Sequence, residues 1–246
     1  MEAADYLDAV RNLPLGSVRQ ITQGQPFVVL SPHPDDETLG AGGLMAKAHA
    51  AGQRAEVVVI TDGSGSHPRS RLYPPQRLID LRRCEVEQAA ALLGLPSGHI
   101  VYLGLPDTQT PRSGPAFEAA VAAIITVVRR TNAATLLTTW AGDPHGDHVA
   151  TARMAEAVRD RMAGLRLWAY PVWGWHLDPQ AAVEGPPPQG LRIDISNHQA
   201  SKRQALAAHA SQMTDLISDD PAGFRFSAKT LAPFLGLFEY FIEMAP

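Results

Sequence analysis

Short apolar runs alternate along this chain with longer segments of helical periodicity, and this alternation limits the fold more than any other feature. The runs have the length of strands and occupy residues 27–30, 55–60, 100–103, 135–139, 165–170 and 191–195. Apolar residues at helical spacing predict helices at 39–51, 75–93, 116–130, 149–162 and 199–213. Repeated β-α units of this kind predict an α/β fold with a Rossmann-like, mostly parallel sheet and helices on both faces.

Length and composition are those of one globular domain, which we expect to span residues 1–246. The net charge is −4 and Lys and Arg form no run, so we expect no nucleic-acid partner. No apolar stretch in the sequence approaches about 18 residues, the length of a transmembrane helix. The acids near Met1 differ from the basic start of a signal peptide, and the single cysteine, Cys84, fits a reducing compartment. We therefore expect a cytoplasmic protein.

Two polar segments each follow a predicted strand. Residues 31–37 read Ser-Pro-His-Pro-Asp-Asp-Glu and follow the run 27–30, and residues 143–148 read Asp-Pro-His-Gly-Asp-His and follow the run 135–139. The carboxyl ends of parallel strands meet at one edge of a sheet, where α/β proteins assemble their sites. We therefore expect the two segments to lie together, at the carboxyl ends of the strands.

Together these segments supply the ligands of a metal ion. Two histidines and one carboxylate with an open coordination position form the ligand set of a catalytic zinc site. His33 and Asp36 stand three residues apart in a turn that Pro34 stiffens, so both can bind one ion. His148, at the start of the predicted helix, is the better ligand in the second segment, whereas His145 lies nearer the loop and faces the substrate.

The remaining polar residues of the two segments are suited to acid and base chemistry. Asp35 lies between two expected ligands and stays free to take a proton from metal-bound water, whose pKa would fall to about 7. A protonated His145 would then stabilise the oxyanion together with the metal, and Asp35 would deliver the proton to the leaving amine. Asp147 can hydrogen-bond an imidazole and fix its tautomer. This arrangement predicts metal-assisted hydrolysis of an amide.

Two other classes of protein share parts of this pattern. Two histidines and one carboxylate also form the facial triad of non-haem iron(II) oxygenases. Those enzymes usually carry the close pair as His-x-Asp on a β-barrel, whereas this chain has His-x-x-Asp on an α/β pattern. A non-catalytic metal-binding or sugar-binding protein on the same fold is the other alternative. Replacement of Asp35 by Ala distinguishes an enzyme from such a binding protein, because an enzyme should lose turnover while it keeps zinc binding.

The segments 31–40 and 145–148 resemble the two signatures of the LmbE-like (PIG-L) N-deacetylases. The resemblance extends to Thr61-Asp-Gly63, to Arg82-x-x-Glu85 and to a late segment, 202–212, so that it covers about residues 27–213. It implies a zinc-dependent enzyme that removes an acyl group, foremost acetyl, from the amide nitrogen of an N-acetylglucosamine-type sugar or a related small amide. The implied partner is therefore a small-molecule substrate.

The resemblance also implies a role for each residue of the site. The implied zinc ligands are His33, Asp36 and His148. Asp35 corresponds to the general base and His145 to the electrostatic and acid partner, which Asp147 tunes. Arg82 falls where the family has an arginine that contacts substrate, and Gly146 stands where the family often has proline.

Several features of the sequence stay open at this point. Three tryptophans, Trp140, Trp173 and Trp175, either line the cleft or pack in the core, and packing is favoured. Packing is also the favoured role of His209, and Asp143 has no assigned role. The loops 63–74 and 171–190 are expected to decide the substrate. The apolar segment 234–242 forms either a last core element or an interface of an oligomer, and the metal is zinc or another divalent ion such as iron.

Overall fold

The computed structural model describes residues 1–244, with the backbone alone described at residue 97. In this part of the chain an eight-stranded sheet has the strand order β1-β7-β8-β6-β5-β2-β3-β4. The strands are β1 (Leu15–Gly16), β2 (Phe27–Ser31), β3 (Ala55–Thr61), β4 (Ile100–Leu105), β5 (Thr135–Thr139), β6 (Arg166–Tyr170), β7 (Gly190–Asp194) and β8 (Phe238–Glu243). Neighbouring strands are parallel, except that β8 runs antiparallel between β6 and β7. The predicted α/β fold with a mostly parallel sheet is confirmed.

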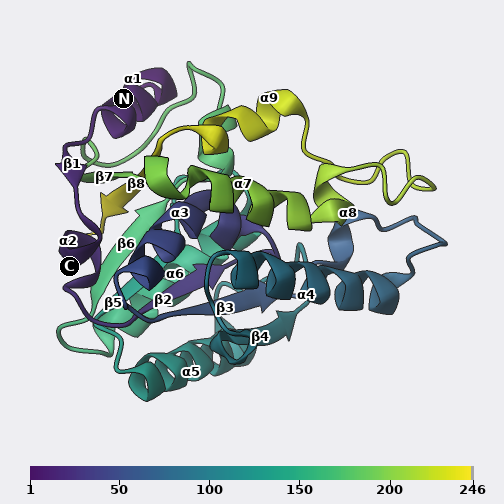
Figure 1. Ribbon diagram of the computed structural model, residues 1–246, viewed down its shortest axis with the longest axis horizontal. Coiled ribbons are helices and arrows are strands. Elements are labelled where there is room, and N and C mark those ends of the chain that lie inside the picture. Colours follow the sequence, from purple (N-terminus) through teal and green to yellow (C-terminus); the bar gives the residue numbers. More distant parts are fainter. Residues whose placement is uncertain (245–246) are drawn as a thin grey trace.

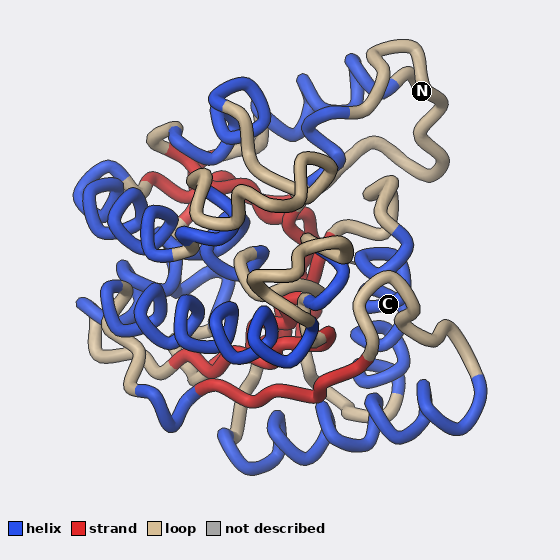
Figure 2. Tube along the Cα trace, turned by 90° about the vertical axis from the view of Figure 1, so that its right-hand side faces the viewer, coloured by secondary structure: helices blue, strands red, loops and turns tan. Residues whose placement is uncertain are grey.

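Helices cover both faces of this sheet (Figures 1 and 2). The helices are α1 (Ala3–Arg11), α2 (Val18–Thr22), α3 (Asp36–Ala50), α4 (Pro75–Leu92), α5 (Gly114–Thr131), α6 (Gly146–Asp160), α7 (Gln199–Ala208), α8 (Ala210–Met213) and α9 (Ala228–Leu231). Alternate residues of a strand face opposite sides of a sheet. Accordingly, Phe27 and Val29 of β2 share a core with α3, α4 and α7, whereas Val28 and Leu30 share the other core with α5 and α6.

The predicted elements agree with the structure except at three places. The six predicted strands are confirmed to within two residues. Helices α3 and α6 begin three residues earlier than predicted, so both polar segments run into the first turn of a helix. The predicted helix 199–213 is divided into α7 and α8, because His209 leaves the helical conformation with φ −78° and ψ 56°.

The beginning and the end of the chain complete the sheet. Helix α1 and the edge strand β1 had no clear signal in the sequence, and β8 fills the gap between β6 and β7. Phe241 of β8 is fully buried, so the apolar segment 234–242 contributes to the core. Within residues 1–244, no helix is long and apolar enough to cross a membrane.

A glycine lets α3 approach the sheet closely behind the first polar segment. A Cβ atom on Gly40 would lie 2.0 Å from Cδ2 of Tyr170 on β6. The hydroxyl of Tyr170 donates a hydrogen bond of 2.6 Å to the carbonyl oxygen of Leu30 on β2. The start of α3 is thereby held directly above the carboxyl ends of β2 and β6.

Candidate metal centre

The two polar segments meet at the carboxyl edge of the sheet, as predicted. The first lies between β2 and α3, the second leads from β5 into α6, and a third loop follows β4 at the same edge. Strand β2 pairs with β3 on one side and β5 on the other, which places the segments beside each other.

Three buried ligand atoms form a nearly equilateral triangle. Nδ1 of His33 lies 3.1 Å from Oδ2 of Asp36. Nε2 of His148 lies 3.2 Å from the same oxygen, and the two nitrogens are 3.2 Å apart. Ligands about 2.0–2.1 Å from a tetrahedral zinc ion lie roughly 3.3 Å from one another. The triangle therefore fits a zinc ion, and its donor set of two imidazoles and one carboxylate is the predicted one.

The outer nitrogens of both imidazoles face carboxylates, as in most metal sites built from histidine. Nε2 of His33 lies 3.0 Å from Asp147 and 3.2 Å from Asp107. Nδ1 of His148 lies 3.4 Å from Asp143. These contacts direct Nδ1 of His33 and Nε2 of His148 toward the triangle.

Two wider groups of possible ligand atoms overlap with the triangle. One atom each of His33, His145 and His148 lies within 4.8 Å of the others, and the same holds for His33, Asp107 and Asp147. Asp107 and Asp147 face the outer nitrogen of His33, so they are better placed to orient this imidazole than to share an ion with it.

Asp35 and Asp36 are adjacent but have opposite electrostatic environments. Burial favours the neutral form of Asp36, yet the imidazoles of His148 and His33 lower its pKa well below the usual range. Burial raises the pKa of Asp35 to about 8, and Arg82 opposes this rise. Neighbouring acids whose pKa values are driven apart are suited to different tasks. Here Asp36 stays ionised, whereas Asp35 can exchange a proton near neutral pH.

Arg82 is held by protein groups around Asp35. Its guanidinium donates hydrogen bonds to Asp35 and to the carbonyl oxygens of Gly63 and Pro34, at 2.9 to 3.1 Å. The residue is 2% exposed but still borders the cavity above the site. Arg82 therefore orients Asp35, and its contact with a substrate stays a prediction.

The surroundings of His145 favour a neutral imidazole, whereas a protonated one had been expected. Burial and the neighbouring imidazoles of His33 and His148 lower the pKa of His145. Nδ1 of His145 accepts a hydrogen bond of 3.3 Å from the backbone N–H of Asp147. The proton of the neutral ring is therefore on Nε2, and His145 can donate a hydrogen bond through that atom.

The carboxylate of Asp147 contacts an imidazole, that of His33, and it accepts the backbone N–H groups of Thr108 and Thr110 at 2.8 and 3.1 Å. On His145 it acts through its charge, which raises the pKa of that imidazole against the larger effects that lower it. Asp147 stands at the start of α6, one residue before His148. Its side chain consequently reaches across to the first segment and ties the loop after β4 to the site.

A cavity of about 230 Å³ opens above these residues. Its floor includes His33, Asp35, Asp36 and His145. Asp107, Gln212 and two aromatic residues of its wall, Phe224 and Phe226, had not been predicted. Asp107 could have been found from the sequence, because it follows a predicted strand, β4, that ends at the same edge of the sheet. The aromatic residues lie in a loop with no such pattern.

The tryptophans and His209 divide between the cavity and the core. Trp173 borders the cavity, whereas Trp140 stacks on Tyr6 of α1 and Trp175 packs edge-on against Tyr240 of β8. His209 is fully buried, with Nε2 at 3.1 Å from the hydroxyl of Thr38.

Comparison with known proteins agrees with this geometry. The family model of the GlcNAc-PI de-N-acetylases (PIG-L) matches residues 28–159, which include both polar segments. A 1D-myo-inositol 2-acetamido-2-deoxy-alpha-D-glucopyranoside deacetylase of Rhodococcus erythropolis is 22% identical and covers 89% of this chain and 90% of its own.

Two solved structures share the fold. The N,N'-diacetylchitobiose deacetylase of Pyrococcus horikoshii has a TM-score of 0.69 and 21% identity, and the match covers 93% of this chain and 87% of that one. The 4-carboxy-2-hydroxymuconate hydratase of Pseudomonas putida has a TM-score of 0.63 and 18% identity, over 90% and 97% of the two chains. Both structures are less than 25% identical to this chain, so these matches show the fold alone. The chain belongs to the PIG-L family, deacetylase-type hydrolases that act on carbon–nitrogen bonds other than peptide bonds.

Proposed function

We propose that this protein is a zinc-dependent N-deacetylase of an N-acetylglucosamine-type sugar or a related small amide. The observation that carries the proposal is the triangle of His33, Asp36 and His148. Two of its corners, His33 and Asp36, line one cavity together with the separate carboxylate of Asp35. A zinc ion held by these three residues would supply a water of lowered pKa and a positive charge for the amide oxygen.

Asp35 is the general base of the proposed reaction. It accepts a proton from the attacking water and returns it to the nitrogen of the leaving amine. Its pKa of about 8 suits both steps, because the group can hold and release a proton near neutral pH. Arg82 keeps the carboxylate in place from the side of α4.

His145 stabilises the oxygen of the amide as it becomes negative. The Nε2–H of the neutral ring is the donor, since Nδ1 is occupied by the backbone of Asp147. One well-placed donor of this kind is typically worth about 3–4 kcal/mol in the transition state. A neutral imidazole can fill this role, and it avoids a second positive charge next to a metal ion.

The substrate class rests on the relatives and on the size of the cavity. The curated relative from Rhodococcus and the structural relative from Pyrococcus both act, by their names, on acetamido sugars. The cavity of about 230 Å³ is smaller than most ligand sites, which span about 300–1,000 Å³. It is therefore suited to the part of a substrate that surrounds the scissile amide, with the rest of a larger substrate outside.

Amine release tests the proposal. Purified protein is assayed on N-acetylglucosamine, on N,N'-diacetylchitobiose and on 1D-myo-inositol 2-acetamido-2-deoxy-alpha-D-glucopyranoside. Each assay is run before chelation, after chelation, and after zinc or iron(II) is added back. We expect the protein to release amine, chelation to abolish this release and added zinc to restore it. The variant Asp35→Asn should release no amine. Asp178→Asn, an exposed acid, is the matched control. Release that persists without metal, or none with the zinc-loaded protein on all three sugars, would overturn the proposal.

A further inference from the structure

We propose that the aromatic wall of the cavity, formed by Trp173, Phe224 and Phe226, binds an apolar group that the substrate carries next to its scissile amide. The preferred substrate is then a hydrophobic conjugate of the acetamido sugar or a longer-chain amide, not the free sugar. This inference rests on the proposed deacetylase function and narrows its substrate class.

The three rings of the aromatic wall form one packed group. The rings of Trp173 and Phe226 are parallel within 2°, with centroids 5.7 Å apart. Phe224 stands edge-on to both, at 5.4 and 4.8 Å. Phe226 is buried, whereas Trp173 and Phe224 keep part of their surface open, and all three line the cavity that holds Asp35 and His145. Covering such apolar surface with a ligand group is favourable.

Polar residues share the lining of this cavity with the aromatic wall. They include Arg82, Asp107, Ser66 and Gln212, whose side chains or backbone can pair with hydroxyl groups. Ligand sites combine apolar walls with a few placed polar groups that orient the ligand. A cavity lined by both polar and aromatic residues fits an amphipathic molecule, in which a hydroxylated ring is joined to an apolar group.

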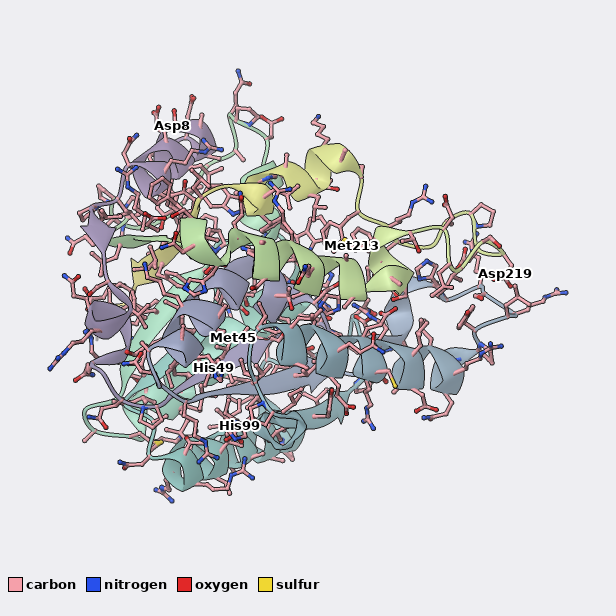
Figure 3. All side chains as sticks on the ribbon, in the orientation of Figure 1. Asp8, Met45, His49, His99, Met213 and Asp219 are labelled. Atoms are coloured by element: carbon pink, nitrogen blue, oxygen red, sulfur yellow. The ribbon has the colours of Figure 1, made fainter. Side chains whose placement is uncertain are left out.

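Two loops that are distant in the sequence clasp each other and fix the position of Phe224. The carboxylate of Asp219 accepts hydrogen bonds from the hydroxyl of Ser70 and from the backbone of Arg71 and Leu72, at 2.6 to 2.9 Å. Asp220 accepts the backbone N–H of Arg69 at 2.8 Å. Figure 1 shows the two loops side by side beyond α8 and before α4, and Figure 3 marks Asp219 at their tip.

Backbone hydrogen bonds extend this clasp into the aromatic wall. The N–H of Phe224 donates to the carbonyl oxygen of Ser66 at 2.7 Å, and the N–H of Phe226 donates to that of Gln212 at 2.9 Å. On the other side, Asp143 accepts the N–H groups that flank Trp173, those of Val172 and Gly174. The wall is therefore preorganised, which lowers the entropy cost of binding a ligand against it.

The aromatic wall also lies outside the part of the chain that carries the family's chemistry. The family model matches residues 28–159, which contain the triangle and Asp35, whereas the three wall residues come after residue 170. The reaction and the choice of substrate are thus placed in different stretches of the chain. Loops 63–74 and 171–190 had been expected to decide the substrate. The first contributes through its hydrogen bonds to the loop 214–227 and the second through Trp173, and the loop 214–227 itself had not been expected to take part.

An apolar group can come from the glycosidic side or from the acyl side of the amide, and two substrate pairs separate these sources. The first pair is the methyl and phenyl glycosides of N-acetylglucosamine, and the second is N-acetyl- and N-hexanoylglucosamine. We expect kcat/KM of the zinc-loaded enzyme to rise roughly tenfold within one pair, the size of a well-formed aromatic contact. The pair that responds identifies which side of the amide faces the wall.

Variants of the aromatic wall connect that preference to the structure. In Phe224→Ala and Trp173→Leu the gain, taken as the ratio of kcat/KM between the two members of the responding pair within each variant, should fall to within about twofold. Phe224→Leu replaces the first variant if it does not fold. Phe238→Ala, which truncates a half-buried phenylalanine of β8 outside this cavity, is the matched control and should keep the full gain.

Binding to the zinc-loaded Asp35→Asn protein gives a readout without turnover. Calorimetry should show that the apolar member of the responding pair binds to Asp35→Asn roughly tenfold more tightly than the other member. In Asp35→Asn/Phe224→Ala the two members of the pair should bind with equal affinity. Equal kcat/KM within both pairs, or a gain that survives in the wall variants, would overturn this inference but leave the deacetylase. Absence of amine release from all four compounds would overturn both.

Discussion

The guanidinium of Arg82 lies 3.1 Å from the carboxylate of Asp35, and both side chains are almost completely buried. This ion pair opposes the effect of burial, which raises the pKa of Asp35 to about 8. Removing the positive charge disfavours the ionised carboxylate further. The pair therefore sets the pH range in which Asp35 can act as a base.

Arg82→Gln should move the acidic limb of the kcat/KM profile to higher pH. Protonated Asp35 cannot accept a proton, so activity falls as the pH falls through its pKa, and the variant raises that pKa. Profiles between pH 5.5 and 9.5 measure the limb, with Arg82→Lys as the variant that keeps the charge. The role of this charge would be contradicted if the acidic limb of Arg82→Gln moved to lower pH, or if the limb moved by the same amount in Arg82→Gln and Arg82→Lys.

Asp143→Asn should weaken zinc binding about 10- to 100-fold, the usual effect of removing a carboxylate behind a ligating histidine. One oxygen of Asp143 faces Nδ1 of His148 at 3.4 Å, and the other holds the loop of Trp173. Competition with a chromophoric chelator measures the zinc Kd. Asp178→Asn should leave the Kd unchanged, and an unchanged Kd in Asp143→Asn as well would remove Asp143 from the site.

His209→Gln should reduce the loss of stability in mild acid. Burial, helped by Arg82, lowers the pKa of His209 to about 3, whereas an unfolded histidine has a pKa of about 6.5. Between these values the unfolded chain binds more protons, so the free energy of unfolding falls as the pH falls from 6.5 toward 3. Urea unfolding at pH 5 and 7.5, with chelator present, should show a smaller difference in the variant. The same difference in both proteins would show that His209 is not the cause.

The sequence predicted the parts of this protein whose patterns are local. Strand β2 is a run of apolar residues followed by a proline. The polar segments after β2 and β5 bring together histidines and aspartates, the residue types that a metal site combines. Because parallel strands end at one edge, the topology alone was enough to bring His33 and His148 together.

The parts that could not be predicted depend on contacts between distant residues. The break at His209 goes with its contact to Thr38 of α3, which no local pattern contains. The partner of Asp147 is set by the approach of His33, 114 residues earlier. The aromatic wall joins Trp173 to residues about fifty positions later, through a loop without periodicity.

The most direct test of the account compares zinc content in Asp35→Asn and Asp36→Asn, two matched changes at adjacent buried acids. Asp36 provides one corner of the ligand triangle, whereas Asp35 is assigned to proton transfer. We predict about one zinc per chain in the wild type and in Asp35→Asn, which should lose turnover by a factor of about 10² to 10⁴. Asp36→Asn should lose the zinc itself. Zinc lost from Asp35→Asn but kept by Asp36→Asn would contradict the assignment of the two carboxylates.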